Sequence, residues 1–285
     1  MPDMSMLITD QLNNSINIAF PPKRIVSLVP SQTELLYDLG LNKEVTGITK
    51  FCIHPQIWFR NKQRIGGTKT VNIDLVKKLQ PDLIIANKEE NEKAQIEELR
   101  QIAPVYVSDI RTLEEALEMI TAIGKLVDKK QRAIELVSQI EKAFQHLTPL
   151  NHQLTAAYLI WKNPYMAAGG DTFINSMLSK CGFINMFQNL HRYPEIQISN
   201  LSTDYLKLPS EPLSVNRPLP PLKNCQLLLL SSEPYPFKQK HVDELQTLLP
   251  STKIMLVDGE MFSWYGSRLL HAAKYFKKLI EQIQA

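Results

Sequence analysis

Short apolar runs alternate with amphipathic helical segments along most of the chain. The runs KRIVSLV (23–29) and DLIIAN (82–87) are aliphatic and β-branched, and each has the length of one buried strand. Each is followed by a helical segment, with a stop signal at Gly40 after the first. Alternation of this kind predicts parallel sheets covered by helices, which is an α/β fold.

The alternation begins again in the second half, after a long helical stretch. Strand patterns recur at 155–161, 226–232 and 253–259, with helical patterns between and after them. Residues 112–147 carry apolar positions at three- and four-residue spacing, and the polar run 127–131 predicts a break there. The sequence therefore predicts two Rossmann-like lobes with parallel sheets, a long backbone helix that joins them, and a ligand cleft between the lobes; the bounds are 1–126, 127–150 and 151–285.

Three helix starts carry capping signals. Ser31 and Glu34 stand at the S-x-x-E spacing of a capping box, Asn72 precedes the next helical segment, and Asp171 precedes a helix that ends at Gly182. The residues before the first strand are read as a polar leader. These signals predict where the helices begin.

Composition narrows the classes of protein that remain. The 285 residues are 44% hydrophobic and 21% charged, so a full core can be buried, and the net charge of +3 comes without the basic block of a nucleic-acid binder. The three cysteines are far apart and show no CxxC spacing, which argues against both a disulfide framework and a cysteine metal site. The N-terminal residues show no secretory signal pattern, and no run has the length of a membrane span.

Aromatic and polar residues follow nearly every predicted strand. Ligands of parallel α/β sheets bind outside the carboxyl ends of the strands, so these residues are the candidate ligand-binding set. The set comprises Ser31, Gln32, Phe51, His54, Trp58, Lys88, Trp161, Tyr165, Arg192, Tyr193, Tyr235, Phe262, Trp264, Tyr265 and Arg268.

Any one aromatic residue near a strand end more often packs on its own loop than on a ligand. The recurrence at seven loops favours ligand contact. The run MFSWYG (261–266) is read as the C-terminal lobe's part of the cleft wall, with at least one of its three aromatic residues packing under the loop. On this reading, Trp264→Ala weakens ligand binding and leaves the ligand-free protein as stable as before.

No motif indicates catalysis. The chain lacks the P-loop, the GxGxxG turn after a strand, the nucleophile elbow and the HExxH zinc motif. His54 and His191 lie in predicted loops, and two histidines do not make a bare metal site, although either could be an axial ligand to a metal held in a macrocycle. The other four histidines are predicted to be solvated.

The chain resembles the periplasmic binding proteins of ABC importers whose lobes are joined by a helical backbone, and among them the cobalamin- and iron-complex-binding proteins. The resemblance rests on ITDQLNNSINIAFPPKRIVSLVPSQTELLYDLGL, NIDLVKKLQPDLIIA, AAGGDTFINSMLSKCGFINMF and SRLLHAAKYFKKL. It implies a monomer that carries cobalamin, haem or a ferric siderophore as transported ligand, without a catalytic cofactor and without nucleic acid. It also implies docking on the permease through one carboxylate per lobe, here Asp74 and Asp204, where the family has glutamate.

Two alternatives remain at this stage. The resemblance implies a periplasmic protein, whereas the missing signal pattern leaves a cytoplasmic carrier or sensor of the same ligands as the first alternative. The second is a chelatase-like enzyme that uses His54, His191 and Glu233, because chelatases share the two-lobed plan. The main interpretation is a binding protein that is not an enzyme.

Overall fold

The structure is a computed structural model that describes residues 4–150, 153–198, 222 and 224–284. The chain divides into two compact units, each described by itself below. The first unit holds Met1–Ala143 together with Trp264–His271, and the second holds Phe144–Ser263 together with Ala272–Ala285. One short segment near the C-terminus, Trp264–His271, therefore belongs to the first unit, whereas the residues on either side of it belong to the second.

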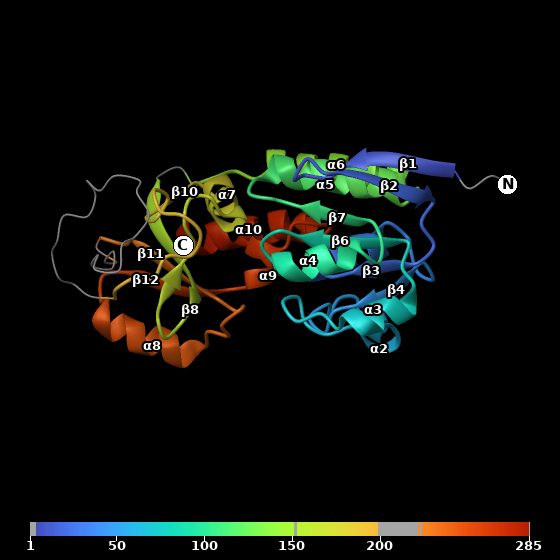
Figure 1. Cartoon of the computed structure of the whole chain (residues 1–285). Helices are drawn as coiled ribbons and strands as arrows, with labels where there is room; N and C mark the ends of the chain where they lie inside the picture. The colour runs from blue at the N-terminus through green and yellow to red at the C-terminus, as the bar shows by residue number, and fades with distance from the viewer. Residues whose placement is uncertain (1–3, 151–152, 199–221, 223, 285) are drawn as a thin grey trace. The chain divides into compact units, whose positions relative to one another are not determined.

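A five-stranded parallel sheet forms the middle of the first unit (Figure 1). The strand order is β5-β4-β3-β6-β7, and Ile25 of β3 is opposite both Val45 and Leu83. The bounds are β3 Ile25–Ser27, β4 Val45–Ile48, β5 Gln63–Arg64, β6 Leu83–Asn87 and β7 Val105–Ser108. Every residue of β3, β6 and β7 is buried, as expected for a parallel sheet with both faces covered. The predicted α/β class is confirmed.

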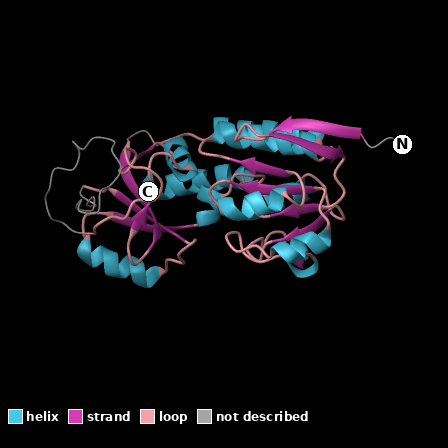
Figure 2. Ribbon diagram, viewed as in Figure 1, coloured by secondary structure: helices cyan, strands magenta, loops and turns pink. Residues whose placement is uncertain are grey.

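Helices pack around this sheet, as Figure 2 shows. They are α1 Pro30–Asp38, α2 Gln56–Asn61, α3 Ile73–Leu79 and α4 Lys93–Arg100. The predicted cap Asn72 is confirmed, since its side chain accepts from the backbone N–H of Leu75. The predicted capping box of α1 is wrong: Val29 is the N-cap and Pro30 takes the first position. The Glu34 carboxylate instead accepts two hydrogen bonds from Arg268.

The predicted polar leader is an antiparallel hairpin of β1 Met4–Thr9 and β2 Ser15–Phe20. Its turn is closed by the Asp10 carboxylate, which accepts from the backbone N–H groups of Leu12 and Asn14. In β2, Ile16 and Ile18 are buried between exposed neighbours, which is the alternation of a half-buried strand and was overlooked in the polar surroundings.

The long helical stretch forms two helices, α5 Leu113–Leu126 and α6 Lys130–Gln145, and the predicted break is confirmed. Thr112 and Glu115 make a capping box at the start of α5. The two helices approach closely near the break, since a methyl group on Gly124 would stand 2.2 Å from the Ala133 methyl carbon. Among the described helices, none combines the length and the apolar character needed to cross a bilayer.

The second unit has its own sheet, of order β10-β8-β11-β12 in parallel, with β9 antiparallel to β8. The bounds are β8 Leu154–Trp161, β9 Met166–Ala167, β10 Phe183–Asn185, β11 Leu227–Ser231 and β12 Lys253–Val257. The helices are α7 Phe173–Lys180, α8 Gln239–Leu248, α9 Gly259–Ser263 and α10 Leu269–Gln284. The cap of α7 is Thr172 and not the predicted Asp171, whose carboxylate instead accepts from the backbone of Arg192.

Candidate functional site

The carboxyl ends of β3, β4, β6 and β7 lie at the same edge of the first unit's sheet, because the strands are parallel. The loops that follow these strands are called here the strand-end loops. Five of the predicted ligand-binding residues lie on them or at the helix start that follows: Ser31, Gln32, Phe51, His54 and Lys88. This edge is the candidate site of the first unit.

A buried polar network holds these loops together. The Gln32 amide nitrogen donates to the Ser108 hydroxyl at 2.6 Å, and the Asn87 amide nitrogen donates to the Ser108 carbonyl at 3.1 Å. The Asn87 side-chain oxygen accepts from the backbone N–H groups of Glu89 and Glu90. Ser31 and Gln32, both predicted to bind the ligand, are 3% and 0% exposed and are therefore buried in the protein.

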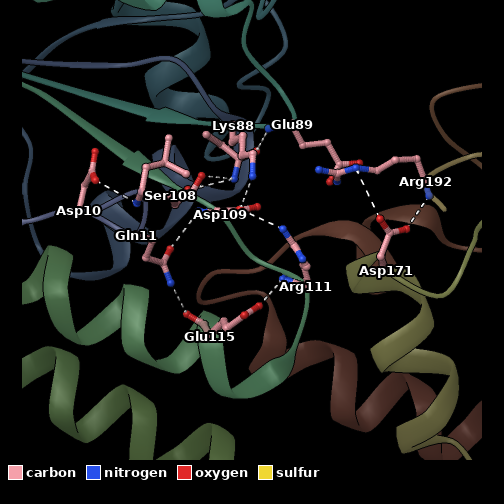
Figure 3. Close-up of polar contacts among 12 residues, drawn as sticks. Asp10, Gln11, Lys88, Glu89, Ser108, Asp109, Arg111, Glu115, Asp171 and Arg192 are labelled. Carbon is pink, nitrogen blue, oxygen red and sulfur yellow. Dashed lines mark hydrogen bonds and ion pairs between the residues drawn. The ribbon is translucent and has the colours of Figure 1, made fainter. Parts of the chain in front are cut away.

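Charged groups lie above this network, at the ends of β6 and β7 (Figure 3). The Lys88 ammonium is 2.6 Å from an Asp109 carboxylate oxygen, and the Arg111 guanidinium is 3.3 Å from the same oxygen. The Gln11 side chain accepts from the backbone N–H of Asp109 and donates to the carbonyl of Glu115. Gln11, in the turn of the hairpin, therefore holds the backbone of Asp109 in position.

Residues 264–271 bring three further candidates to the first unit. The Trp264 ring is 5.6 Å from the His54 ring, and the Arg268 guanidinium lies 4.7 Å from the Trp264 ring centre. Arg268 also donates twice to the Glu34 carboxylate, at 2.8 and 2.6 Å. Trp264, Tyr265 and Arg268 are 7%, 5% and 8% exposed. Their expected place was the C-terminal lobe's wall, whereas the structure groups this segment with the first unit.

Two other predicted residues are packed in the protein's interior. Trp58 is 2% exposed, and its indole N–H donates to Asn42, which precedes β4 at the amino edge of the sheet. Phe262 is fully buried in the second unit, with ring centres 5.0 Å from Tyr158 and 4.7 Å from Phe276. Phe51, in contrast, is 50% exposed on the loop after β4.

An aromatic cluster follows β8 and β11 of the second unit. Tyr235 is its centre, with ring centres 5.7 Å from Trp161, 4.8 Å from Phe237 and 5.6 Å from His241. Trp161 is 40% exposed and Tyr235 is half-buried. The sequence-predicted residues Trp161 and Tyr235 are thus brought together at the carboxyl edge of the second sheet.

Lys162 and Tyr165 border this cluster. The Lys162 ammonium is bonded to the Glu244 carboxylate and lies 5.9 Å from the Tyr165 ring centre. Because of that bond, the pKa of Lys162 is raised and the pKa of Glu244 is lowered. The pair is ionised at neutral pH.

His241 is a member of this cluster that the sequence interpretation missed. It was predicted to be solvated, yet it is 5% exposed beside Tyr235 and Phe237. Its Nδ1 accepts from the backbone N–H of Lys238 at 2.9 Å, so the neutral ring carries its proton on Nε2, 3.5 Å from the Tyr235 hydroxyl. The aromatic run YPF, a few residues before His241, is the signal that could have indicated its burial.

Burial, followed by the charges of Lys162 and Lys240, lowers the pKa of His241. Folding therefore favours the neutral ring. The stability that the neutral ring contributes is complete above the ordinary pKa of about 6.5, and it is lost as the pH falls from there through the lowered pKa of the folded protein.

We expect His241→Asn, which keeps an acceptor for the Lys238 N–H, to lose less stability than the wild type between pH 7.5 and 5. Denaturant unfolding at several pH values measures this, with exposed His271→Asn as the control; equal pH profiles for the wild type and His241→Asn would contradict it.

Asp171 organises the loop that carries His191, Arg192 and Tyr193. Its carboxylate is 3.5 Å from the His191 ring nitrogen and 3.8 Å from the Arg192 guanidinium nitrogen (Figure 3 shows the Arg192 contact). Burial alone would raise the pKa of Asp171, but the backbone N–H and the charge of Arg192 outweigh it and hold the pKa below its usual range. Tyr193 is half-buried on the same loop.

The glycine pair before α7, Gly169 and Gly170, allows the backbone of residues 188–192 to approach closely. Gly169 donates to the carbonyl of Arg192 and Gly170 to the carbonyl of Leu190. A methyl group on Gly170 would stand 1.8 Å from the Gln188 carbonyl oxygen. Close approach of backbone explains these glycines without a ligand.

The three cysteines are free and buried. Burial raises the pKa of all three thiols, that of Cys225 to about 11, so none is a reactive thiolate at neutral pH. Within the described ranges, no three His, Cys, Asp or Glu side chains are grouped as a metal site would need.

Two grooves of the first unit lie away from the strand-end loops. One, of about 610 Å³, is lined by the hairpin, α5 and α6, and the other, of about 420 Å³, by β2 and the segment from α4 to β7. Neither is lined by a residue of the predicted ligand-binding set.

Known proteins are similar to this chain in sequence and in fold. A family model described as periplasmic binding protein matches residues 25–208, well over half of the chain. The vitamin B12-binding protein of Vibrio cholerae is 26% identical over 187 residues, which are 64% of this chain and 67% of that protein. YvrC of Bacillus subtilis, an uncharacterized ABC transporter substrate-binding lipoprotein, is 29% identical over 184 residues, 60% of this chain and 58% of that one.

A solved structure extends the similarity to nearly the whole chain. The periplasmic heme-binding protein RhuT from Roseiflexus sp. RS-1, in its apo form, matches with a TM-score of 0.72 at 17% identity. The match covers 92% of this chain and 99% of that one. At this identity the similarity is one of fold.

Proposed function

Because the chain belongs to the periplasmic binding protein family, we propose that it is the solute-binding component of an ABC importer and that its solute is a metal-containing cofactor. The observation that carries the proposal is the family match over residues 25–208, which spans the strand-end loops of the first unit and the first strand of the second. A relative named as vitamin B12-binding and a fold neighbour named as heme-binding support cobalamin and haem as ligand classes. Ferric siderophores belong to the proposed class by the resemblance of the sequence.

The exposed and half-buried aromatic residues that follow strands of the two sheets are the proposed ligand contacts. They are Phe51 in the first unit and Trp161, Tyr165, Tyr193 and Tyr235 in the second. Each aromatic contact with a planar ligand contributes roughly 0.5–1.5 kcal/mol beyond apolar burial, so several together hold a large macrocycle without a covalent bond. The buried candidates, among them Gln32 and Trp264, would act by positioning the loops.

Permease docking through acidic residues is part of the proposal. Asp74 lies in the first turn of α3 with its side chain 87% exposed, and it is 4.0 Å from Lys77. Asp204, the second predicted docking residue, lies outside the described residues. An exposed carboxylate at Asp74 is available to an arginine of a membrane partner. The proposed place of action is outside the cytoplasm, as a periplasmic or lipid-anchored protein.

A ligand panel tests the proposed function. Purified protein is mixed with cobalamin, cobinamide, haemin and several ferric siderophores, and the melting temperature and absorbance spectrum are recorded. We expect at least one compound to raise the melting temperature and change the spectrum, because a ligand bound only by the folded state stabilises it. If every compound leaves both unchanged, the proposal fails.

A pair of variants then tests the aromatic contacts. Phe51→Ala is expected to weaken binding of the selected compound about two- to tenfold, the equivalent of one aromatic contact. Leu7→Ala is the control, because Leu7 is 73% exposed but lies on the hairpin and not on a strand-end loop. Equal affinities for both variants and the wild type would remove Phe51 from the site.

A further inference from the structure

The outer edge of strand β1, in the hairpin of the first unit, is unpaired. Among the described residues, β1 pairs only with β2. The Asp10 N–H donates to the Asn14 carbonyl, and hydrogen-bonded pairs recur at every second residue of an antiparallel ladder. Ile8 therefore directs its backbone groups at β2, whereas the N–H and C=O groups of Leu7 and Thr9 point away from it.

This edge lacks the features that usually prevent further pairing. Natural edge strands are protected by lysine, proline or a bulge. Strand β1, MSMLIT, has no charged residue and no proline, and its register with β2 is regular from Met4 to Thr9. Leu7 in its middle is 73% exposed. The edge can therefore accept a further strand through main-chain hydrogen bonds.

A groove of about 610 Å³ lies beside this edge. It is lined by Ile8 and Thr9 of β1 and by no residue of β2, whereas the second groove is lined by β2 and not by β1. The two grooves therefore flank opposite edges of the hairpin, which lies alongside α5 and α6 (Figure 1). Leu117, Ala122 and Val137 of these helices give the first groove an apolar floor. A strand added to β1 would lie in this groove and pack alternate side chains on that floor.

The charge of the groove selects among the segments that could add to β1. Its lining holds the carboxylates of Glu114, Glu118 and Glu141 and the ammonium of Lys125, so three negative charges and one positive charge give −2. Lys142 follows Glu141 in the chain but does not line the groove. Within the part of the chain that the structure describes, neither Glu118 nor Glu141 forms a salt bridge. Charge complementarity favours a segment with basic side chains.

A second copy of this chain meets that requirement poorly. The strand that it could offer to β1 is its own MSMLIT, which carries no charge. A symmetric β1–β1 pair would also bring two identical acidic grooves together, and like charges at an interface oppose association. The observations therefore favour a different protein as the partner.

We propose that the edge of β1 and the groove beside it are a docking site for an extended segment of another protein, in which apolar residues alternate with lysine or arginine. The segment adds to the hairpin as a third strand, with main-chain hydrogen bonds to Leu7 and Thr9. Its apolar side chains pack on α5 and α6, and its long basic side chains reach Glu118 and Glu141. The site shares no residue with the predicted ligand-binding set, so the inference is independent of the proposed solute.

Fluorescence anisotropy of a labelled synthetic peptide tests the inference. The probe is Lys-Val-Lys-Ile-Lys-Val-Lys with blocked ends. One control peptide has glutamate in place of each lysine, and the other keeps the sequence but has N-methyl groups on alternate backbone nitrogens, which removes strand donors. We expect the probe to bind about tenfold or more tightly than either control, because charge and main-chain bonding both contribute.

A proline variant tests the strand edge. Leu7→Pro removes an N–H group that points away from β2, and proline is tolerated on an edge strand where the N–H faces outward. We expect it to weaken binding of the probe about tenfold or more, because it removes a donor and blocks close pairing. Asn17→Pro is the matched control: Asn17 is opposite Leu7, and its N–H points to the other edge of the hairpin. Urea unfolding establishes that both variants are folded.

Charge variants test the groove without touching the backbone. Glu118→Gln and Glu141→Gln are each expected to weaken binding of the probe about threefold, and Glu135→Gln, an exposed carboxylate of α6 outside the groove, should leave it unchanged. The inference is overturned if the probe does not bind, if a control peptide binds equally well, or if Leu7→Pro and both groove variants bind like the wild type. It is also overturned if sedimentation shows a dimer that Leu7→Pro dissociates, since a second copy would then occupy the edge. The solute panel is unaffected by each of these outcomes.

Discussion

Replacing Trp264 by alanine is expected to lower the free energy of unfolding of the ligand-free protein by about 3 kcal/mol or more, the usual effect of removing a buried indole. The side chain is 7% exposed and lies between the His54 ring and the Arg268 guanidinium, both in the first unit. Its removal leaves a cavity beside a buried ion pair, that of Arg268 with Glu34. This reverses the expectation from sequence, in which Trp264 lined a cleft and contributed nothing to the stability of the ligand-free protein.

Trp161→Ala is the matched control, because Trp161 is 40% exposed at the end of β8. The same substitution there should lower the unfolding free energy by less than about 1 kcal/mol, since a half-exposed side chain leaves no closed cavity. Urea unfolding followed by far-ultraviolet circular dichroism compares the two variants. If Trp264→Ala is as stable as Trp161→Ala, Trp264 is a rim residue and the sequence interpretation was right.

Most helices and strands could be predicted from the sequence, because each is determined mainly by residues within or next to the element. The strands β6 Leu83–Asn87 and β11 Leu227–Ser231 each contain four consecutive apolar residues, and the cap Asn72 and the break after Leu126 depend on near neighbours. The hairpin at 4–20 was missed because its turn, DQLNN, lacks the Asn-Gly or Asp-Gly pair that marks a short hairpin, although the alternation in β2 indicates a strand.

The candidate site was less predictable because its burial depends on residues that are distant in the sequence. Arg268 and Glu34 are 234 positions apart, and no local pattern indicates that they meet. Aromatic residues in a Gly- and Ser-containing loop look the same whether they line a ligand site or pack under another segment. The expectation that ligands bind beyond the carboxyl ends of parallel strands selected residues near those ends. It does not distinguish exposed Phe51 and Trp161 from buried Trp58 and Phe262, which the structure does.

Gly170→Ala is the second substitution with a large expected effect, and it should lower the free energy of unfolding by about 3 kcal/mol or more. The new methyl group would stand 1.8 Å from the Gln188 carbonyl oxygen and 2.7 Å from its carbonyl carbon, far inside van der Waals contact. These atoms are backbone, and they cannot rotate away as a side chain does. The segment is also held there by the bond from the Gly170 N–H to the Leu190 carbonyl.

Relief of the clash requires the loop before His191 to move away from the start of α7, which would also displace Arg192 from Asp171. Gly67→Ala is the matched control: its methyl group would stand 2.9 Å from the Thr70 hydroxyl, which can rotate away, so the loss should stay below about 1 kcal/mol. Thermal and urea unfolding of the two variants give the comparison. Equal stability of Gly170→Ala and wild type would mean that the chain around Gln188 does not approach Gly170 as closely as described, and the glycine pair would again be open to a ligand.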